Sequence, residues 1–190
     1  MIAQNLAKKL KLIILDRDGV INEESPDYIK STDEWIPIPG SLEAIALLTK
    51  AGYTIAVATN QSGVGRGYYT EVGLARIHQK MLDCVKAVGG AIDKIFYCPH
   101  HPDKHCACRK PAIGLFKQIA TTYSINLVDV ISVGDSLRDI QAAERVGCKP
   151  MLVLTGNGSQ TLKENPDLIN KIPAFQDLLM TVKNLLKKNY

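Results

Sequence analysis

Two aspartates directly follow a run of four apolar residues near the start of the chain. The run from Leu12 to Leu15 is typical of a buried strand in a parallel sheet, and Asp16 and Asp18 come next. Open α/β sheets bind their ligands at the carboxyl ends of strands. Two crowded carboxylates are costly unless a cation or a proton compensates them. The pair therefore predicts a Mg²⁺ site in which one aspartate is a nucleophile and the other an acid and base.

Other polar groups follow later predicted strands. They are Thr59 and Asn60 after a strand at 53–58, Lys110 beyond a cysteine-rich segment, and Gly134 and Asp135 after a strand at 130–133. A carboxylate that attacks phosphorus forms an aspartyl-phosphate, and Thr59 and Lys110 could hold the phosphate oxygens, whose charge must be stabilised during transfer. Together these groups predict phosphoryl transfer.

Three of the five cysteines lie in one segment with three of the four histidines. An odd cysteine count argues against a disulfide framework, and such a cluster favours metal binding. The predicted Zn²⁺ ligands are Cys98, His100, Cys106 and Cys108, with His101 or His105 as alternatives to His100. A closed tetrahedral set leaves no position for substrate, so this zinc would order the loop that carries Arg109 and Lys110.

Alternating strand and helix patterns predict a doubly wound parallel sheet that positions these groups. Further strands are expected at 94–97 and, as the last one, at 151–154. Helices are expected after caps at Ser41 and Thr70, and at 113–120, 137–146 and 173–187, with a turn before the last one. The polar segment 22–39 could form a lid, and 62–67 a glycine-rich loop.

The bulk composition predicts a single domain over residues 1–190. The chain is 46% hydrophobic and 22% charged, with a net charge of only +4, which argues poorly for a nucleic-acid partner. No apolar run could cross a bilayer, and the amino terminus lacks an apolar signal core. We therefore expect a cytoplasmic monomer with a small-molecule substrate and no membrane partner.

The motifs resemble those of the haloacid dehalogenase superfamily of phosphatases, in the same order. The first motif is Asp16-Arg17-Asp18-Gly19, the second Thr59, the third Lys110, and the fourth Gly134-Asp135 with Asp139 after it. The resemblance implies a Rossmann-like fold with a small loop cap and a zinc loop. It implies that Asp16 is the nucleophile and Asp18 the acid and base. It also implies Mg²⁺ bound by Asp16, the backbone carbonyl of Asp18, and Asp135.

The pattern C-x-H…C-x-C-R-K-P is similar to that of the zinc-bearing branch of this superfamily. The branch contains histidinol-phosphate phosphatases and heptose-1,7-bisphosphate 7-phosphatases, and the stretch from Thr59 to Tyr68 resembles the latter. The resemblance implies removal of the 7-phosphate of a heptose bisphosphate, on the bacterial route to lipopolysaccharide. Arginine suits a second phosphate and would repel the ammonium group of histidinol phosphate. The expected substrate contacts are Tyr28, Asn60, Gln61, Ser62, Arg66 and Arg109.

Several alternatives are compatible with these motifs. A histidinol-phosphate phosphatase would need a carboxylate for the ammonium group, and a non-catalytic zinc-loop module would leave the aspartates unused. Asp139 could touch the metal site indirectly or be a surface charge. Arg17 is expected to be an ion-pair partner, and Trp35 a packing anchor for the lid segment. Tyr28 could equally pack its loop, and His78 is expected to be packed or on the surface.

Overall fold

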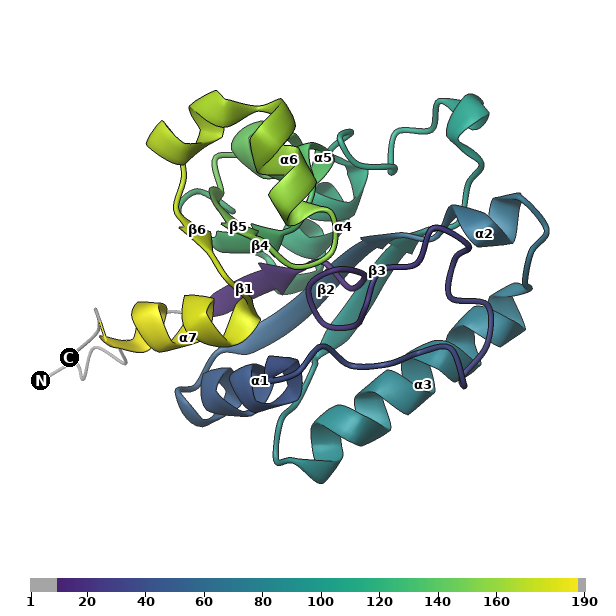
Figure 1. Cartoon of the computed structure of the whole chain (residues 1–190), viewed down its shortest axis with the longest axis horizontal. Helices are drawn as coiled ribbons and strands as arrows, with labels where there is room; N and C mark the ends of the chain where they lie inside the picture. Colours follow the sequence, from purple (N-terminus) through teal and green to yellow (C-terminus); the bar gives the residue numbers. More distant parts are fainter. Residues whose placement is uncertain (1–9, 188–190) are drawn as a thin grey trace, which may run out of the picture.

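The computed structural model describes residues 10–187, and its central element is a parallel sheet (Figure 1). The strands are β1 (Leu12–Leu15), β2 (Thr54–Asn60), β3 (Lys94–Cys98), β4 (Ile131–Gly134), β5 (Lys149–Val153) and β6 (Ala174–Phe175). Their order is β3-β2-β1-β4-β5-β6, and every neighbouring pair is parallel. Chain order reverses on the two sides of β1, which is where such sheets bind ligands.

Helices cover both faces of the sheet (Figure 1). They are α1 (Ser41–Lys50), α2 (Ser62–Gly65), α3 (Glu71–Ala87), α4 (Gly114–Tyr123), α5 (Leu137–Glu144), α6 (Gly158–Glu164) and α7 (Leu178–Lys187), with short 3₁₀ helices η1 (Pro102–Lys104) and η2 (Pro166–Asn170). None of the helices in residues 10–187 is long and apolar enough to span a membrane. The amino-terminal residues behind the cytoplasmic expectation lie outside this range.

Successive side chains of β1 point to opposite faces of the sheet, and the core accordingly has two layers. Ile13 and Leu15 pack in one buried cluster with residues of α1, α3 and α7, whereas Leu12 and Ile14 pack in another with residues of α4 and α5. Successive side chains of a strand point to opposite faces, so a strand covered on both faces must be apolar throughout. The predicted doubly wound fold is confirmed.

Several predicted boundaries were wrong. Gly40, not Ser41, is the N-cap of α1, and the Ser41 hydroxyl donates to the carbonyl of Ile21 at 2.6 Å. The expected loop at 62–67 contains the short helix α2. The strand expected at 151–154 is β5, which begins at Lys149. It is not the last strand, because the two-residue strand β6 follows it. The terminal helix was expected to start at residue 173, where β6 now lies, and it begins only at Leu178.

The lid segment is anchored at both ends. Asn22 forms isolated bridges with Asp18 and with Pro37, and Trp35 is buried as predicted. Between these anchors the chain makes an excursion over the carboxyl end of β1, which brings Tyr28 to the pocket described next.

Candidate active site

A pocket lies over the carboxyl ends of β1, β2 and β4. Its walls include Asp16, Asp18, Thr59 and Asp135 from the predicted catalytic and metal set, and Tyr28, Asn60, Gln61, Ser62 and Arg109 from the predicted substrate contacts. Parallel strands deliver their carboxyl ends to one edge, which is why residues more than 100 positions apart meet here. Two predicted residues are not part of the walls: Lys110 lies beneath them, and Arg66 lies outside.

Lys110 is buried between two carboxylates. Its Nζ lies 3.1 Å from Oδ1 of Asp16 and 2.5 Å from Oδ1 of Asp139, and it donates to the carbonyl of Ala58 at 2.6 Å. Burial alone would lower the pKa of Lys110, but Asp139 and Asp16 outweigh that effect and raise it. The side chain is therefore a fixed cation beside Asp16.

Asp139 is buried and is not a surface charge. Its Oδ2 accepts from the backbone and the hydroxyl of Ser136, which together form a capping box at the start of α5. Burial opposes ionisation, yet Lys110 and Ser136 lower the pKa of Asp139. Asp139, which is not one of the pocket walls, thus holds Lys110 in place.

Asp18 accepts hydrogen bonds from three side chains. Arg17 binds it through Nε at 2.9 Å and through Nη2 at 2.7 Å, which matches the predicted ion pair. The amides of Asn22 and Gln61 donate at 2.9 and 2.8 Å. Burial works against the charge, but Arg17 and these amides lower the pKa of Asp18. The carboxylate is thereby held ionised, the form in which it can take up a proton.

The opposite side of the pocket is formed by Asp135. Its Oδ2 accepts from the backbone of Asn157 at 2.8 Å and from its side chain at 3.1 Å. Gly19, at φ +75°, lies against this carboxylate so closely that a Cβ would overlap it. This turn of the first motif therefore requires glycine.

The carboxylates fit a divalent cation. One oxygen each of Asp16, Asp135 and Asp139 can be chosen so that all lie within 4.8 Å of one another. Burial, with the neighbouring carboxylates and against the effect of Lys110, raises the pKa of Asp16 to about 7. Burial and Asp139 raise that of Asp135 to about 7. Oxygen ligands of this kind suit Mg²⁺, which would relieve this repulsion.

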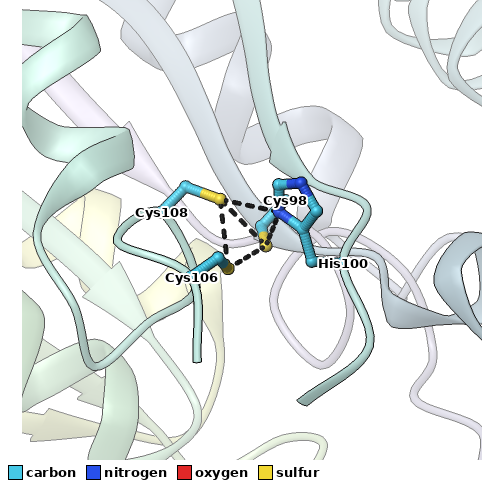
Figure 2. A group of neighbouring side chains, drawn as sticks. All are labelled: Cys98, His100, Cys106 and Cys108. Atoms are coloured by element: carbon cyan, nitrogen blue, oxygen red, sulfur yellow. Dashed lines mark hydrogen bonds between the residues drawn. The ribbon is translucent and has the colours of Figure 1, made fainter. Parts of the chain in front are cut away.

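The predicted zinc ligands converge on one point (Figure 2). The sulfur of Cys98 lies 3.5 Å from that of Cys106 and 3.2 Å from that of Cys108, and Nδ1 of His100 lies 3.1 Å from the sulfur of Cys108. Sulfur ligands of a tetrahedral zinc lie about 3.8 Å apart, given Zn–S bonds of about 2.3 Å. The donor set fits zinc, and His100 rather than His101 or His105 belongs to it.

Asn60 joins the cysteine loop to the sheet. Its side chain donates to the carbonyl of Lys110 at 3.1 Å and accepts from the amide of Lys110 at 3.0 Å. This pair of bonds fixes the backbone at the end of the loop, immediately after Arg109. The order of the loop is thus coupled to the position of the Lys110 side chain.

At the rim of the pocket, Tyr28 links the lid segment to the segment that follows α2. Its ring makes an edge contact with the ring of Tyr68, with centroids 5.0 Å apart, and the guanidinium of Arg66 lies 5.9 Å from its centroid. Arg109 lies deeper, and within residues 10–187 its buried Nη1 has no hydrogen-bond partner. Arg109 is therefore the better placed of the two arginines to meet an anion in the pocket.

Comparison with known proteins supplies the family. A family model described as HAD-hydrolase-like matches residues 107–178. A relative from Pseudomonas aeruginosa, a D-glycero-beta-D-manno-heptose-1,7-bisphosphate 7-phosphatase, is 54% identical over 176 residues, which cover 93% of this chain and 98% of the relative. The same enzyme from Bordetella bronchiseptica is 50% identical over 179 residues, which cover 94% and 99%. This chain belongs to the heptose-1,7-bisphosphate 7-phosphatase family.

A solved structure agrees with this family membership. The D,D-heptose 1,7-bisphosphate phosphatase of B. bronchiseptica, complexed with magnesium and phosphate, superposes with a TM-score of 0.91 at 50% identity, covering 94% of this chain and 99% of that one. The predicted haloacid dehalogenase-like class is confirmed.

In this member of the heptose-bisphosphatase family, three ionisable side chains of the pocket were not predicted from the sequence: Glu24, Tyr69 and Arg138. Ser25, Pro26 and Ile29 of the lid segment also line the pocket and were not predicted either. Arg138 follows the fourth motif by three residues, and its Nε donates to the Ser136 hydroxyl at 3.1 Å. Tyr69 directly precedes the helix cap Thr70. The only sequence signal for either was closeness to a motif.

Proposed function

We propose that this protein removes the 7-phosphate of D-glycero-β-D-manno-heptose 1,7-bisphosphate. The observation that carries the proposal is the placement of Asp16 in the pocket with the cation of Lys110 on one side and the ionised Asp18 nearby. Nearly full-length similarity to two relatives named for this reaction supports the choice of substrate and of the β anomer.

In the proposed mechanism an oxygen of Asp16 attacks the phosphorus and the bond to the sugar oxygen breaks. Asp18 takes up a proton before this step and gives it to the leaving oxygen; its hydrogen bonds to Arg17, Asn22 and Gln61 favour the ionised form to which it then returns. Water then attacks the aspartyl-phosphate, Asp18 takes the proton of the water, and inorganic phosphate leaves while Asp16 is regenerated. Thr59 and Lys110 hold the phosphate oxygens.

Two metals complete the proposal. Asp16, the backbone carbonyl of Asp18, and Asp135 would hold Mg²⁺, which supplies positive charge beside the nucleophile. Cys98, His100, Cys106 and Cys108 would hold a structural Zn²⁺. The hydrogen bonds between Asn60 and Lys110 explain how an ordered zinc loop positions the lysine without taking part in the chemistry.

Substrate selection is assigned to the pocket walls and rim. The second phosphate would bind Arg109, assisted by Arg138, which exposes its guanidinium to the same pocket. Arg66 would act from the rim behind Tyr28. We assign sugar contacts to Tyr28, Asn60, Gln61 and Ser62; the side chains of Asn60 and Gln61 already bind other protein groups, which leaves less capacity for hydroxyls.

One observation favours a second candidate, a histidinol-phosphate phosphatase. Glu24 is an exposed carboxylate in the pocket wall and could meet an ammonium group. Arg109 and Arg138 in the same pocket weigh against a cationic substrate.

The deciding experiment is phosphate release in the presence of Mg²⁺ from the two anomers of heptose 1,7-bisphosphate and from histidinol phosphate, measured side by side. We expect a large preference for the β-bisphosphate. A preference for histidinol phosphate would retain the mechanism and reject the substrate. Silence on all three, with zinc bound, would favour a non-catalytic zinc-loop module.

A further inference from the structure

The Gln61 side chain uses both ends of its amide inside the protein. The residue is buried, and its Nε2 donates to Oδ2 of Asp18 at 2.8 Å and to the hydroxyl oxygen of Thr59 at 2.9 Å. Its Oε1 accepts from the Tyr69 hydroxyl at 2.9 Å. The amide therefore connects the side chain of Asp18 with Tyr69, another residue of the pocket walls.

Asp18 determines which end of the Gln61 amide faces it, and Tyr69 holds the other end in place. An amide turned by 180° would point Oε1 at the ionised carboxylate, which can only accept, and would replace an attraction by a repulsion. Burial raises the pKa of Tyr69 to about 12, so its hydroxyl keeps the proton that it donates. The ring of Tyr69 packs directly against Gly63, in space that the Cβ of any other residue at this position would occupy. This contact fixes the position of the ring.

We propose that Tyr69 and Gln61 are positioning residues for Asp18, and this inference rests on the function proposed above. Arg17 holds the carboxylate from one side, while Gln61, locked by Tyr69, holds it from the side of β2. The two contacts together fix the direction in which the carboxylate can exchange a proton. Without the tyrosine hydroxyl, Oε1 loses its partner and the amide is held less firmly against Asp18.

The two chemical steps differ in their need for Asp18, and this difference makes the proposal testable. When p-nitrophenyl phosphate is the substrate, Asp16 forms its bond to phosphorus as the p-nitrophenolate leaves, and that anion needs no proton. In the second step water forms a bond to phosphorus, Asp18 takes its proton, and the bond from Asp16 to phosphorus breaks. A disoriented Asp18 should therefore slow the second step and spare the first.

The experiment follows both steps in single turnover with Mg²⁺, using enzyme in excess over p-nitrophenyl phosphate. Absorbance reports p-nitrophenolate release, and acid quenching reports phosphate bound to the protein. In Tyr69→Phe we expect release within about twofold of the natural protein and phosphoenzyme decay about tenfold slower, a fraction of the 10²- to 10⁴-fold that a general base contributes. Gln61→Leu, which removes the donor itself, should slow the decay further.

Tyr68→Phe is the matched control, because Tyr68 is the neighbouring tyrosine, is exposed, and has no hydroxyl hydrogen bond among those found in residues 10–187. Its two rates should equal those of the natural protein. Phosphoenzyme decay in Tyr69→Phe within twofold of normal would overturn the proposal, as would equal slowing of both steps, which indicates general damage to the site.

A further variant separates this failure from failure of the proposed function. In Asp18→Asn, phosphate should accumulate on Asp16, since the second step lacks its base. If that protein carries no acid-stable phosphate while the natural protein still releases p-nitrophenolate, the aspartyl-phosphate mechanism is wrong, and the positioning role is overturned with it.

Discussion

His78 should make the stability of this protein fall as the pH is lowered from 7.5 to 5.5. It lies in α3, buried beside the ring of Tyr97 with centroids 5.7 Å apart, and its Nε2 has no partner among the residues described. Burial, assisted by Arg17 and opposed by Asp18, lowers the pKa of His78 from 6.5 to about 3. The folded protein thus keeps this imidazole neutral where the unfolded chain protonates it.

The sign and size follow from linkage. Because the folded-state pKa is depressed, the stability is fully present above pH 6.5 and is lost as the pH falls toward about 3. Protonation of His78 stabilises the unfolded chain alone, by about 0.1 kcal/mol at pH 7.5 and by about 1.4 kcal/mol at pH 5.5. The free energy of unfolding should therefore fall by about 1.3 kcal/mol between these two pH values. Any folded pKa well below 5 gives nearly the same figure.

Urea unfolding at the two pH values measures this loss. Between pH 7.5 and pH 5.5 the free energy of unfolding should fall in both proteins, but by about 1.3 kcal/mol less in His78→Phe than in the natural protein. The other titrating groups are the same in both proteins, so their contributions cancel in this difference. His78→Gln serves as the control for packing: its absolute stability will differ from that of His78→Phe, but its pH dependence should be the same. An identical pH-dependent loss in all three proteins would refute the neutral buried histidine.

Other expectations concern the site. Asp16→Asn should abolish turnover while the circular dichroism spectrum and the zinc content stay unchanged; residual activity near normal would reject the nucleophile. Cys106→Ser should reduce bound zinc, measured by elemental analysis, from about one ion per chain to nearly none, and should lower activity through Lys110; a zinc-free, fully active protein would contradict the structural metal. Arg109→Ala should reduce the preference for bisphosphate over p-nitrophenyl phosphate by about tenfold or more, and Arg66→Ala by less, since Arg66 lies outside the pocket walls; equal losses of both activities would remove these arginines from selection.

Features encoded by neighbouring residues could be predicted from the sequence. Leu12 to Leu15 is apolar at every position, which indicates a strand covered on both faces, and Asp16 necessarily stands at its end. The four zinc-ligand candidates lie within eleven positions, so chain connectivity alone nearly brings them together.

Features that depend on distant partners could not be predicted. The hydroxyl of Ser41 binds a carbonyl twenty residues away instead of capping its own helix, so tertiary structure overrode the local signal. Asp139 could not be distinguished from a surface charge, because its burial depends on Lys110, which only the fold brings near. The strand β6 has two residues and is defined by pairing with β5, which leaves no periodic pattern to detect.

Backbone hydrogen bonds hold the two ends of the lid segment, residues 21–23 and 36–38, side by side. The amide of Glu23 donates to Ile36 at 2.9 Å and that of Ile38 donates to Ile21 at 3.0 Å, while Asn22 and Trp35 are buried next to these hydrogen bonds. Bringing the two ends of a loop together costs conformational entropy. Here that cost is offset by the contacts at the two ends and does not depend on the residues between them. Loops of related phosphatases grafted between the same two ends would therefore change which molecules enter the pocket while Asp18 keeps its contact with Asn22, provided that they keep an apolar side chain where Ile29 packs in the core.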